Sequence, residues 1–199
     1  MSSRKDVGTE IGLSGKERLF LAALARRSVE SAVNGEPPAP VPHAGGLLER
    51  EYRVFVSIHK QGMLRGCMGS PAGEAPLASA VVDAARAAAS EDPRFWPLMQ
   101  EELTHISLEI SVLTPMERIT GPEEIHVGIH GVFVQKGSMS GLLLPQVASE
   151  LHWDAVTFLE HACEKAGLHR SAWEEPDTEI RIFSAEVFEE RDDRGDEPV

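Results

Sequence analysis

Apolar residues recur at helical spacing in three segments of the chain, which predicts three helices. The first follows Ser14, which forms a capping box with Glu17 three residues later. The second covers residues 75–92, a stretch rich in alanine. The third follows the capping residue Asp154 and covers residues 155–167.

Alternating apolar and polar residues, or short apolar runs bounded by glycine and proline, predict strands in the remaining segments. The predicted strands are residues 50–60, 63–70 and 104–115, two or three short strands within 124–146, and a last strand within 177–190. The order of helices and strands has no regular β-α-β alternation. It therefore predicts an α+β fold with mostly antiparallel pairing and packed helices.

The turn between the first two strands decides which of their side chains share a face. A three-residue loop over 60–62 is favoured over a two-residue loop, because its last position suits glycine in the left-handed conformation. This register pairs Ser57 with Arg65 and Phe55 with Cys67. The core face then carries Val56, Ile58 and Leu64, and the other face carries Ser57, His59, Arg65 and Cys67.

Arg65 and Cys67, in the stretch LRGCMG, are the main candidates for chemistry. A guanidinium beside the thiol would lower its pKa and attract a carboxylate or phosphate. Ser57 shares their predicted face, and Gly66 and Gly69 would let a ligand approach closely. Three interpretations of Cys67 stay open: a thiolate nucleophile, part of a binding pocket, or a packed cysteine whose neighbouring arginine pairs with a carboxylate.

Two further positions are candidates for the same site. Arg94, in DPRF, would supply a second positive group, although Asp92 there also serves to end the helix by accepting backbone N–H groups. Ser140, in the glycine-rich KGSMSG turn, would border the site, but no general base stands at a recognised spacing. His126 and His130, taken as strand residues, would lie about 13 Å apart, so no metal site is expected.

Composition limits the possible functions. The chain of 199 residues fits one substantial domain, and 42% hydrophobic residues are typical of a globular protein. Its net charge of -13 argues against direct binding to nucleic acid. No apolar run is long enough to span a membrane, and no secretory signal is visible. With only two cysteines, Cys67 and Cys163, the expected location is the cytoplasm, and no cofactor is expected.

The segment LRGCMG resembles the Leu-Arg-Gly-Cys-Ile-Gly hallmark of the AMMECR-one domain family, with Met68 in place of isoleucine. The segments DPRF, LEISVLTP, SGLLLPQVASE and FLEHACEKAGL agree with the family in the same order. The resemblance implies one domain over residues 14–189, with two unequal lobes and the hallmark segment lining a cleft between them. The larger lobe would include the N-terminal and C-terminal parts and the smaller would be inserted. Residues 1–13 would be an extension and 190–199 an acidic disordered tail.

Prokaryotic members of this family are called AmmeMemoRadiSam system protein A, which implies a Memo-like protein and a radical-SAM protein as partners. Two hypotheses of function follow. In the first, the protein is a non-catalytic component or accessory partner of that system. In the second, it is an enzyme acting on an anionic small molecule or modified residue, with Cys67 as thiolate and Arg65 as anion binder. The lack of a visible base, nucleotide loop or metal set favours the first.

Overall fold

The computed structural model describes residues 11–41, 45–69 and 75–190 of the chain. The α-helices are α1 (Gly15–Val33), α2 (Leu77–Ser90), α3 (Pro145–Glu150) and α4 (Ala155–Lys165). The strands are β1 (Glu51–Lys60), β2 (Met63–Gly69), β3 (Ala75–Pro76), β4 (Ile106–Leu113), β5 (Glu117–Ile119), β6 (Gly131–Lys136), β7 (Met139–Leu143), β8 (Glu179–Phe183) and β9 (Ala185–Glu189). Short 3-10 helices are η1 (Gly46–Glu49), η2 (Gln100–His105), η3 (Pro122–Glu124) and η4 (Arg170–Glu174).

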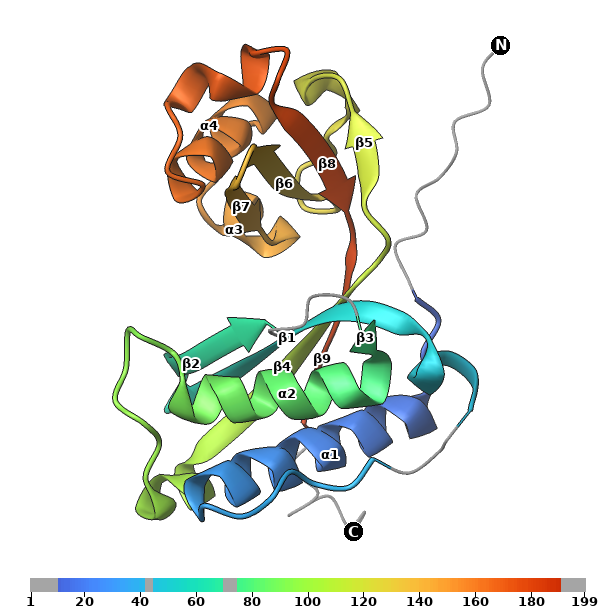
Figure 1. Cartoon of the computed structure of the whole chain (residues 1–199), viewed down its shortest axis with the longest axis vertical. Coiled ribbons are helices and arrows are strands. Elements are labelled where there is room, and N and C mark those ends of the chain that lie inside the picture. The colour runs from blue at the N-terminus through green and yellow to red at the C-terminus, as the bar shows by residue number, and fades with distance from the viewer. Residues whose placement is uncertain (1–10, 42–44, 70–74, 191–199) are drawn as a thin grey trace, which may run out of the picture. The chain divides into compact units, whose positions relative to one another are not determined.

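This mixture of helices and antiparallel sheets confirms the α+β class expected from the sequence (Figure 1). Within the described ranges, no helix has the length and apolar character needed to cross a membrane. The predicted acidic tail and most of the predicted N-terminal extension lie outside the described residues.

Contacts within the chain divide it into two compact units. Of the described residues, unit 1 comprises residues 11 and 113–186, and unit 2 comprises residues 12–41, 45–69, 75–112 and 187–190. Unit 2 contains a sheet in the order β2-β1-β4-β9, with β3 also paired to β1, and unit 1 contains a sheet in the order β5-β8-β6-β7. Each unit therefore has its own sheet.

In unit 2, α1 and α2 lie on one face of the sheet, and α2 is the helix against the strands (Figure 1). The capping box predicted at Ser14 is present, since Ser14 Oγ accepts from the Glu17 N–H and Glu17 Oε2 accepts from the Ser14 N–H. Because most residues of α2 are small, the helix packs closely on both the sheet and α1, and ten of its fourteen residues are buried.

The predicted hairpin register is wrong. Gln61 and Gly62 both have positive φ, at 53° and 77°, so the turn has two residues and Lys60 pairs with Met63. A bulge then shifts the register beyond His59. As a result, Ser57 pairs with Cys67 and Ile58 with Gly66, and Arg65 falls at the bulge. The core face carries Val56 and Ile58 as expected, together with Val54, but Leu64 is exposed.

In unit 1, α4 covers one face of the sheet and begins at the predicted cap, where Asp154 accepts from the Thr157 N–H. Gly141 on β7 allows this contact, because a Cβ there would meet the Ala162 carbonyl oxygen at 2.5 Å. The core between sheet and helix includes Phe158, Leu159, Ala162, Cys163, Val132, Val134, Ile180 and Ile182. Cys163 is thus a core residue.

Candidate functional site

The guanidinium of Arg65 is bound by the protein itself. It donates from Nε and Nη2 to the two carboxylate oxygens of Glu102, at 3.0 and 2.9 Å. It also donates from Nη1 to the Trp96 carbonyl at 2.9 Å and from Nη2 to the Pro97 carbonyl at 3.4 Å. Four of its five N–H groups can be used in this way. Arg65 therefore braces the segment after α2 against the hairpin, as the packed interpretation of LRGCMG requires.

Glu102 at the start of η2 completes this brace. Its carboxylate also accepts from Lys60 Nζ at 2.9 Å and from the Met99 N–H at 3.0 Å. The side chain is only 6% exposed. The hydrogen bonds from Arg65, with those from Lys60 and Met99, outweigh burial and lower the pKa of Glu102 to about 2. The carboxylate is thus ionised and fully paired.

A second buried carboxylate, Asp92, fixes the backbone of Cys67. Asp92 Oδ2 accepts from the Cys67 N–H at 2.8 Å, and Asp92 Oδ1 accepts from the Arg94 N–H at 3.1 Å. The Arg94 guanidinium donates to both oxygens and to the Cys67 carbonyl. The hydrogen bonds from Arg94 hold the pKa of Asp92 at about 2 despite its burial. Asp92 therefore accepts a backbone N–H group just after α2, which is the role in ending the helix considered from the sequence. It also anchors the backbone of β2 at Cys67.

Arg94 differs from Arg65 in facing solvent. Its side chain is 56% exposed, and its Nη1 has no hydrogen-bond partner among the described residues. Its pKa is raised, chiefly by its hydrogen bonds to Asp92, and its Nη2 lies 3.3 Å from the Cys67 carbonyl oxygen, so the guanidinium lies beside the backbone of Cys67. The cation available to an outside anion is therefore that of Arg94.

The Cys67 thiol is half-buried and accepts a hydrogen bond from Ser57 Oγ at 3.3 Å. Ser57 itself is almost fully buried. The hydrogen bonds of the described residues give the sulfur no histidine or carboxylate partner. Since nucleophilic cysteines need a base or a lowered pKa, this arrangement supplies a hydroxyl donor but no base.

The glycines of the motif serve packing. A Cβ at Gly66 would lie 2.3 Å from the Ala88 carbonyl oxygen, so this glycine makes room for the backbone of α2. A Cβ at Gly69 would meet the ring of Phe55 at 2.7 Å. The space predicted for a ligand at Gly66 is thus occupied by a helix, and that at Gly69 by an aromatic side chain.

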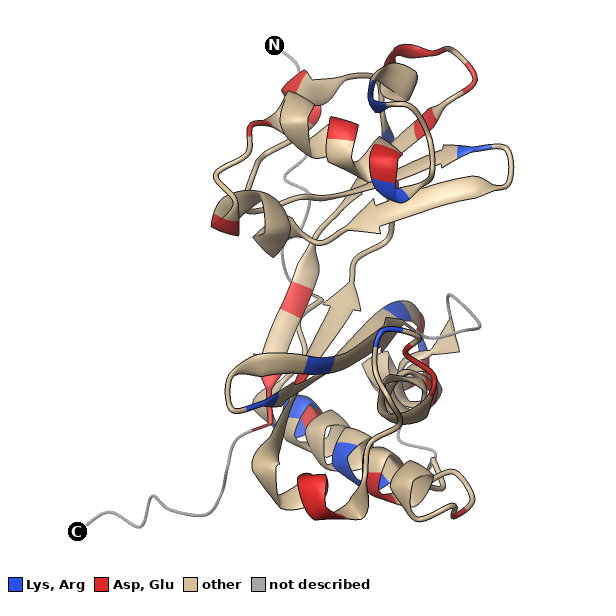
Figure 2. Cartoon of the chain, turned by 90° about the vertical axis from the view of Figure 1, so that its left-hand side faces the viewer, with Lys and Arg blue, Asp and Glu red and all other residues tan. Residues whose placement is uncertain are grey.

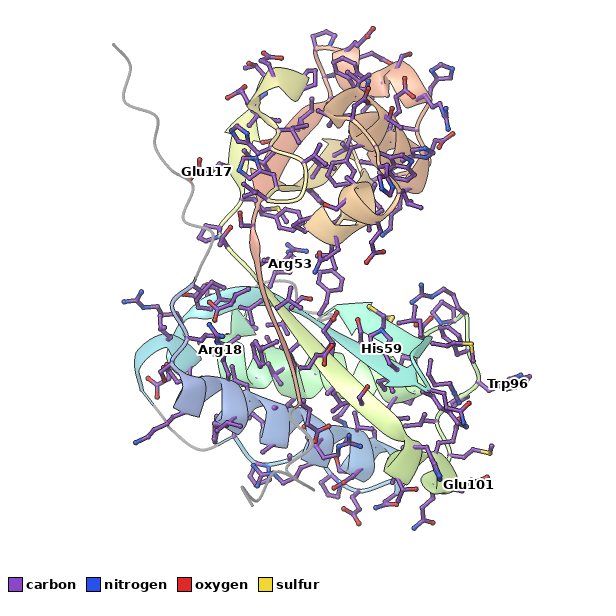
Figure 3. All side chains as sticks on the ribbon, turned by 180° about the vertical axis from the view of Figure 1, so that it is seen from behind. Arg18, Arg53, His59, Trp96, Glu101 and Glu117 are labelled. Atoms are coloured by element: carbon purple, nitrogen blue, oxygen red, sulfur yellow. The ribbon has the colours of Figure 1, made fainter. Side chains whose placement is uncertain are left out.

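The loop 95–99 presents the most exposed large apolar side chain of the described chain. Trp96 is 88% exposed and points away from unit 2 (Figure 3). Three more exposed apolar side chains lie in the two segments joined by Arg65: Met63, Leu64 and Met99. Sequence reasoning missed Trp96 and Glu102. A tryptophan next to proline in the short segment between a helix and the next strand was a usable signal, whereas nothing marks Glu102 as the partner of Arg65.

The remaining candidates lie in unit 1. Ser140 is exposed on β7 and pairs with Gln135. His126 and His130 are in a turn, not a strand, and their ring centroids are 5.1 Å apart, so the predicted 13 Å separation is wrong. His130 Nδ1 accepts from the His126 N–H, and burial lowers the pKa of His130. The described residues contain no group of three or more His, Cys, Asp or Glu side chains placed to hold a metal ion.

The chain is an α+β protein in which Arg65 holds the LRGCMG hairpin against Glu102. Comparison with known proteins shows its family. A family model described as AMMECR1 matches residues 22–188, so the chain belongs to the AMMECR1 family, as its motifs predicted. A protein of Thermococcus gammatolerans is 46% identical over 190 residues, which cover 88% of this chain and 91% of the relative. A protein of Caldivirga maquilingensis is 42% identical over 192 residues, covering 89% and 87%.

A solved structure agrees with the fold. The crystal structure of the uncharacterized protein PH0010 from Pyrococcus horikoshii matches with a TM-score of 0.81 at 41% identity, covering 89% of this chain and 93% of that one. The names of these relatives state no activity. Family and fold are therefore established, and function has to be argued from the geometry.

Proposed function

We propose that this protein is a non-catalytic binding component, an accessory partner of a Memo-like protein and a radical-SAM protein. It docks on a partner through the Trp96 loop, residues 95–99. The observation that carries this proposal is the set of hydrogen bonds that the Arg65 guanidinium donates within the protein. This guanidinium donates hydrogen bonds to Glu102 and to the carbonyls of Trp96 and Pro97. In this proposal the motif therefore holds a loop in place and does not bind an anion.

A braced loop with an exposed tryptophan suits recognition. Tryptophan is enriched among the residues that dominate binding energy at protein interfaces. A rigid loop also loses little conformational entropy when it binds, because its backbone is already fixed. The exposed side chains of Met63 and Met99 would extend the apolar contact, and methionine adapts to irregular surfaces.

The test is a binding measurement with the full chain and each purified partner, by titration calorimetry. Trp96→Ala should weaken binding by about 30-fold, since hot-spot truncations cost about 2 kcal/mol or more. Leu151→Ala is the matched control, because Leu151 is an exposed apolar residue of unit 1. It should leave the affinity unchanged. Cys67→Ser should also bind normally if Cys67 only packs.

Two results would contradict the proposal. If neither protein binds the wild-type chain, the partners are misassigned. If one binds but Trp96→Ala and Leu151→Ala behave alike, the docking surface lies elsewhere.

A second candidate function, an enzyme with Cys67 as thiolate, is favoured by one observation. Cys67 is half-buried and its carbonyl accepts from the exposed guanidinium of Arg94, whereas Cys163 is fully buried. In this case Arg94, in place of Arg65, would bind the anionic substrate. Alkylation against pH tests it, with Cys163 as internal control because burial raises the pKa of its thiol. A Cys67 midpoint well below about 8.5, the value of a free thiol, supports the enzyme. Modification as slow as that of Cys163 rules it out.

A further inference from the structure

The face of the unit 1 sheet that α4 leaves uncovered carries two arginines directly opposite each other. Arg118 on β5 pairs with Arg181 on β8. Side chains opposite each other on antiparallel strands point to the same face, with Cβ atoms about 5 Å apart. Their sequence neighbours Ile119, Ile180 and Ile182 point into the core, so the two arginines point outward. Like charges in this position destabilise a sheet, and folding alone does not call for them.

An aromatic ring and a leucine continue the same row across the sheet. Phe133 on β6 pairs with Arg181, and Leu142 on β7 pairs with Phe133. The Arg181 guanidinium lies over the Phe133 ring, 5.9 Å from its centroid. Neither Phe133 nor Leu142 is fully buried. The row therefore runs from two cations to an apolar surface that solvent can reach.

The positive charge of this row is only partly neutralised. Arg181 Nε donates to Glu179 Oε1 at 2.9 Å. The pKa of Glu179 is lowered chiefly by that hydrogen bond and by the charge of Arg181, and less by the charge of Arg118. Among the described residues, Arg118 forms no hydrogen bond or ion pair, so two guanidiniums share one carboxylate.

The excess of positive charge in unit 1 is confined to the row that contains Arg118 and Arg181. Acidic residues outnumber basic ones in the stretch 113–186, and they mark both α-helices of unit 1, α3 and α4, in Figure 2. Two of the three arginines in that stretch are Arg118 and Arg181. An anion bound between them would remove their mutual repulsion and would use their free N–H groups as bidentate donors.

We propose that this face binds a nucleoside phosphate, with the phosphate between Arg118 and Arg181 and the base against Phe133 and Leu142. The next row supports this assignment, because Gln135 pairs with Ser140 on the same face, two residues along each strand. Gln135 Nε2 donates to the Gly137 carbonyl, which leaves its Oε1 to accept from an amino group of the base. Ser140, predicted to bind a ligand, would then do so here. This site is independent of the Trp96 loop.

The test is NMR titration of the full chain with adenosine monophosphate, alongside adenosine and ribose 5-phosphate. Shifts should appear at Arg118, Phe133 and Arg181, and each fragment should bind more weakly than the nucleotide. Arg118→Ala should weaken nucleotide binding about tenfold, as expected for loss of hydrogen bonds to a charged group. Arg170→Ala is the control with the same change of charge, in an exposed arginine that pairs with Glu164 near α4. It should bind as the wild type does.

Three outcomes would overturn the proposal. The first is no saturable binding at millimolar nucleotide. The second is equal weakening by Arg118→Ala and Arg170→Ala, which would reduce the effect to net charge. The third is binding of a single-stranded adenine hexanucleotide much more tightly than the mononucleotide, with the same dependence on Arg118, which would assign the face to RNA. Because Arg118 is exposed on a short edge strand, the variant should fold normally, and its thermal midpoint checks this.

Discussion

Replacement of Arg65 by alanine separates a structural role from an anion-binding role. The substitution leaves the buried Glu102 carboxylate with only Lys60 and the Met99 N–H as partners. Removing one member of a buried ion pair costs about 3–5 kcal/mol, and the remaining Lys60 favours the lower end of that range. The pKa of Glu102 gives a similar figure. A fall from 4.5 to about 2 corresponds to about 3 kcal/mol of stabilisation from all its partners.

We therefore expect Arg65→Ala to lower the free energy of unfolding by about 3 kcal/mol at pH 7. The loss should shrink as the pH falls from 4.5 toward 2, because the pKa of Glu102 is depressed in the folded protein and its ion pair contributes only while it is ionised. Denaturant unfolding at pH 7 and pH 3 measures both values. Lys60→Ala is the control, since its partly exposed side chain contributes about 1 kcal/mol or less.

A loss of unfolding free energy below about 0.5 kcal/mol at pH 7, the usual range for surface substitutions, would refute the claim that Arg65 stabilises the fold through Glu102. Arg65 would then be free to bind a ligand, and the sequence interpretation of it as an anion binder would stand again. Glu102→Gln gives an independent check, because the neutral amide keeps the shape of the side chain but loses the charge. It should destabilise the protein to a similar extent.

Three further predictions concern stability. Gly66→Ala should cost about 2–3 kcal/mol in denaturant unfolding, because its Cβ would collide with the Ala88 carbonyl oxygen and the helix backbone would have to move. Acid titration should show loss of about 2 kcal/mol between pH 3.8 and 2 from Asp92, whose folded pKa is depressed mainly by Arg94. Stability should also begin to fall below pH 6.5, because burial lowers the pKa of His130 and the unfolded chain takes up a proton first.

Each of these predictions has a matched comparison. Gly69→Ala should cost less than Gly66→Ala, since it meets only the movable ring of Phe55, and equal costs would contradict the helix contact. Asp92→Asn should be less stable at pH 7 and should lack the step below pH 3.8. His130→Gln should remove the decline that starts near pH 6.5, and its persistence in this variant would assign the decline to another group.

Much of the local structure followed from the sequence. The capping residues Ser14 and Asp154 each satisfy N–H groups at the first turn of a helix, which depends only on residues three or four positions away. The strand over 106–113 was equally clear, because its apolar residues alternate with the period of a strand. The motif LRGCMG identified the family for the same reason, since it is a contiguous pattern.

The chemistry of the motif depended on contacts that no local pattern contains. A two-residue turn set the pairings next to it, and a one-residue bulge shifted the pairings beyond His59 and placed Ser57 opposite Cys67. The partner of Arg65 lies 37 residues away in Glu102, and that of the Cys67 N–H lies 25 residues away in Asp92. Which carboxylate meets which guanidinium is set by how helices and strands pack, so sequence alone could not distinguish a free arginine from a paired one.

The sequence by itself thus determined the family, the α+β class, the N-caps of two helices and the positions of most strands, because these arise from short-range periodicity and capping. The tertiary structure decided that Arg65 and Gly66 support the fold, that Arg94 keeps a free N–H group, that Trp96 is exposed, and that Arg118 and Arg181 share a face. The physical reason is that burial and charge pairing depend on distances between segments far apart in the chain, which only packing fixes.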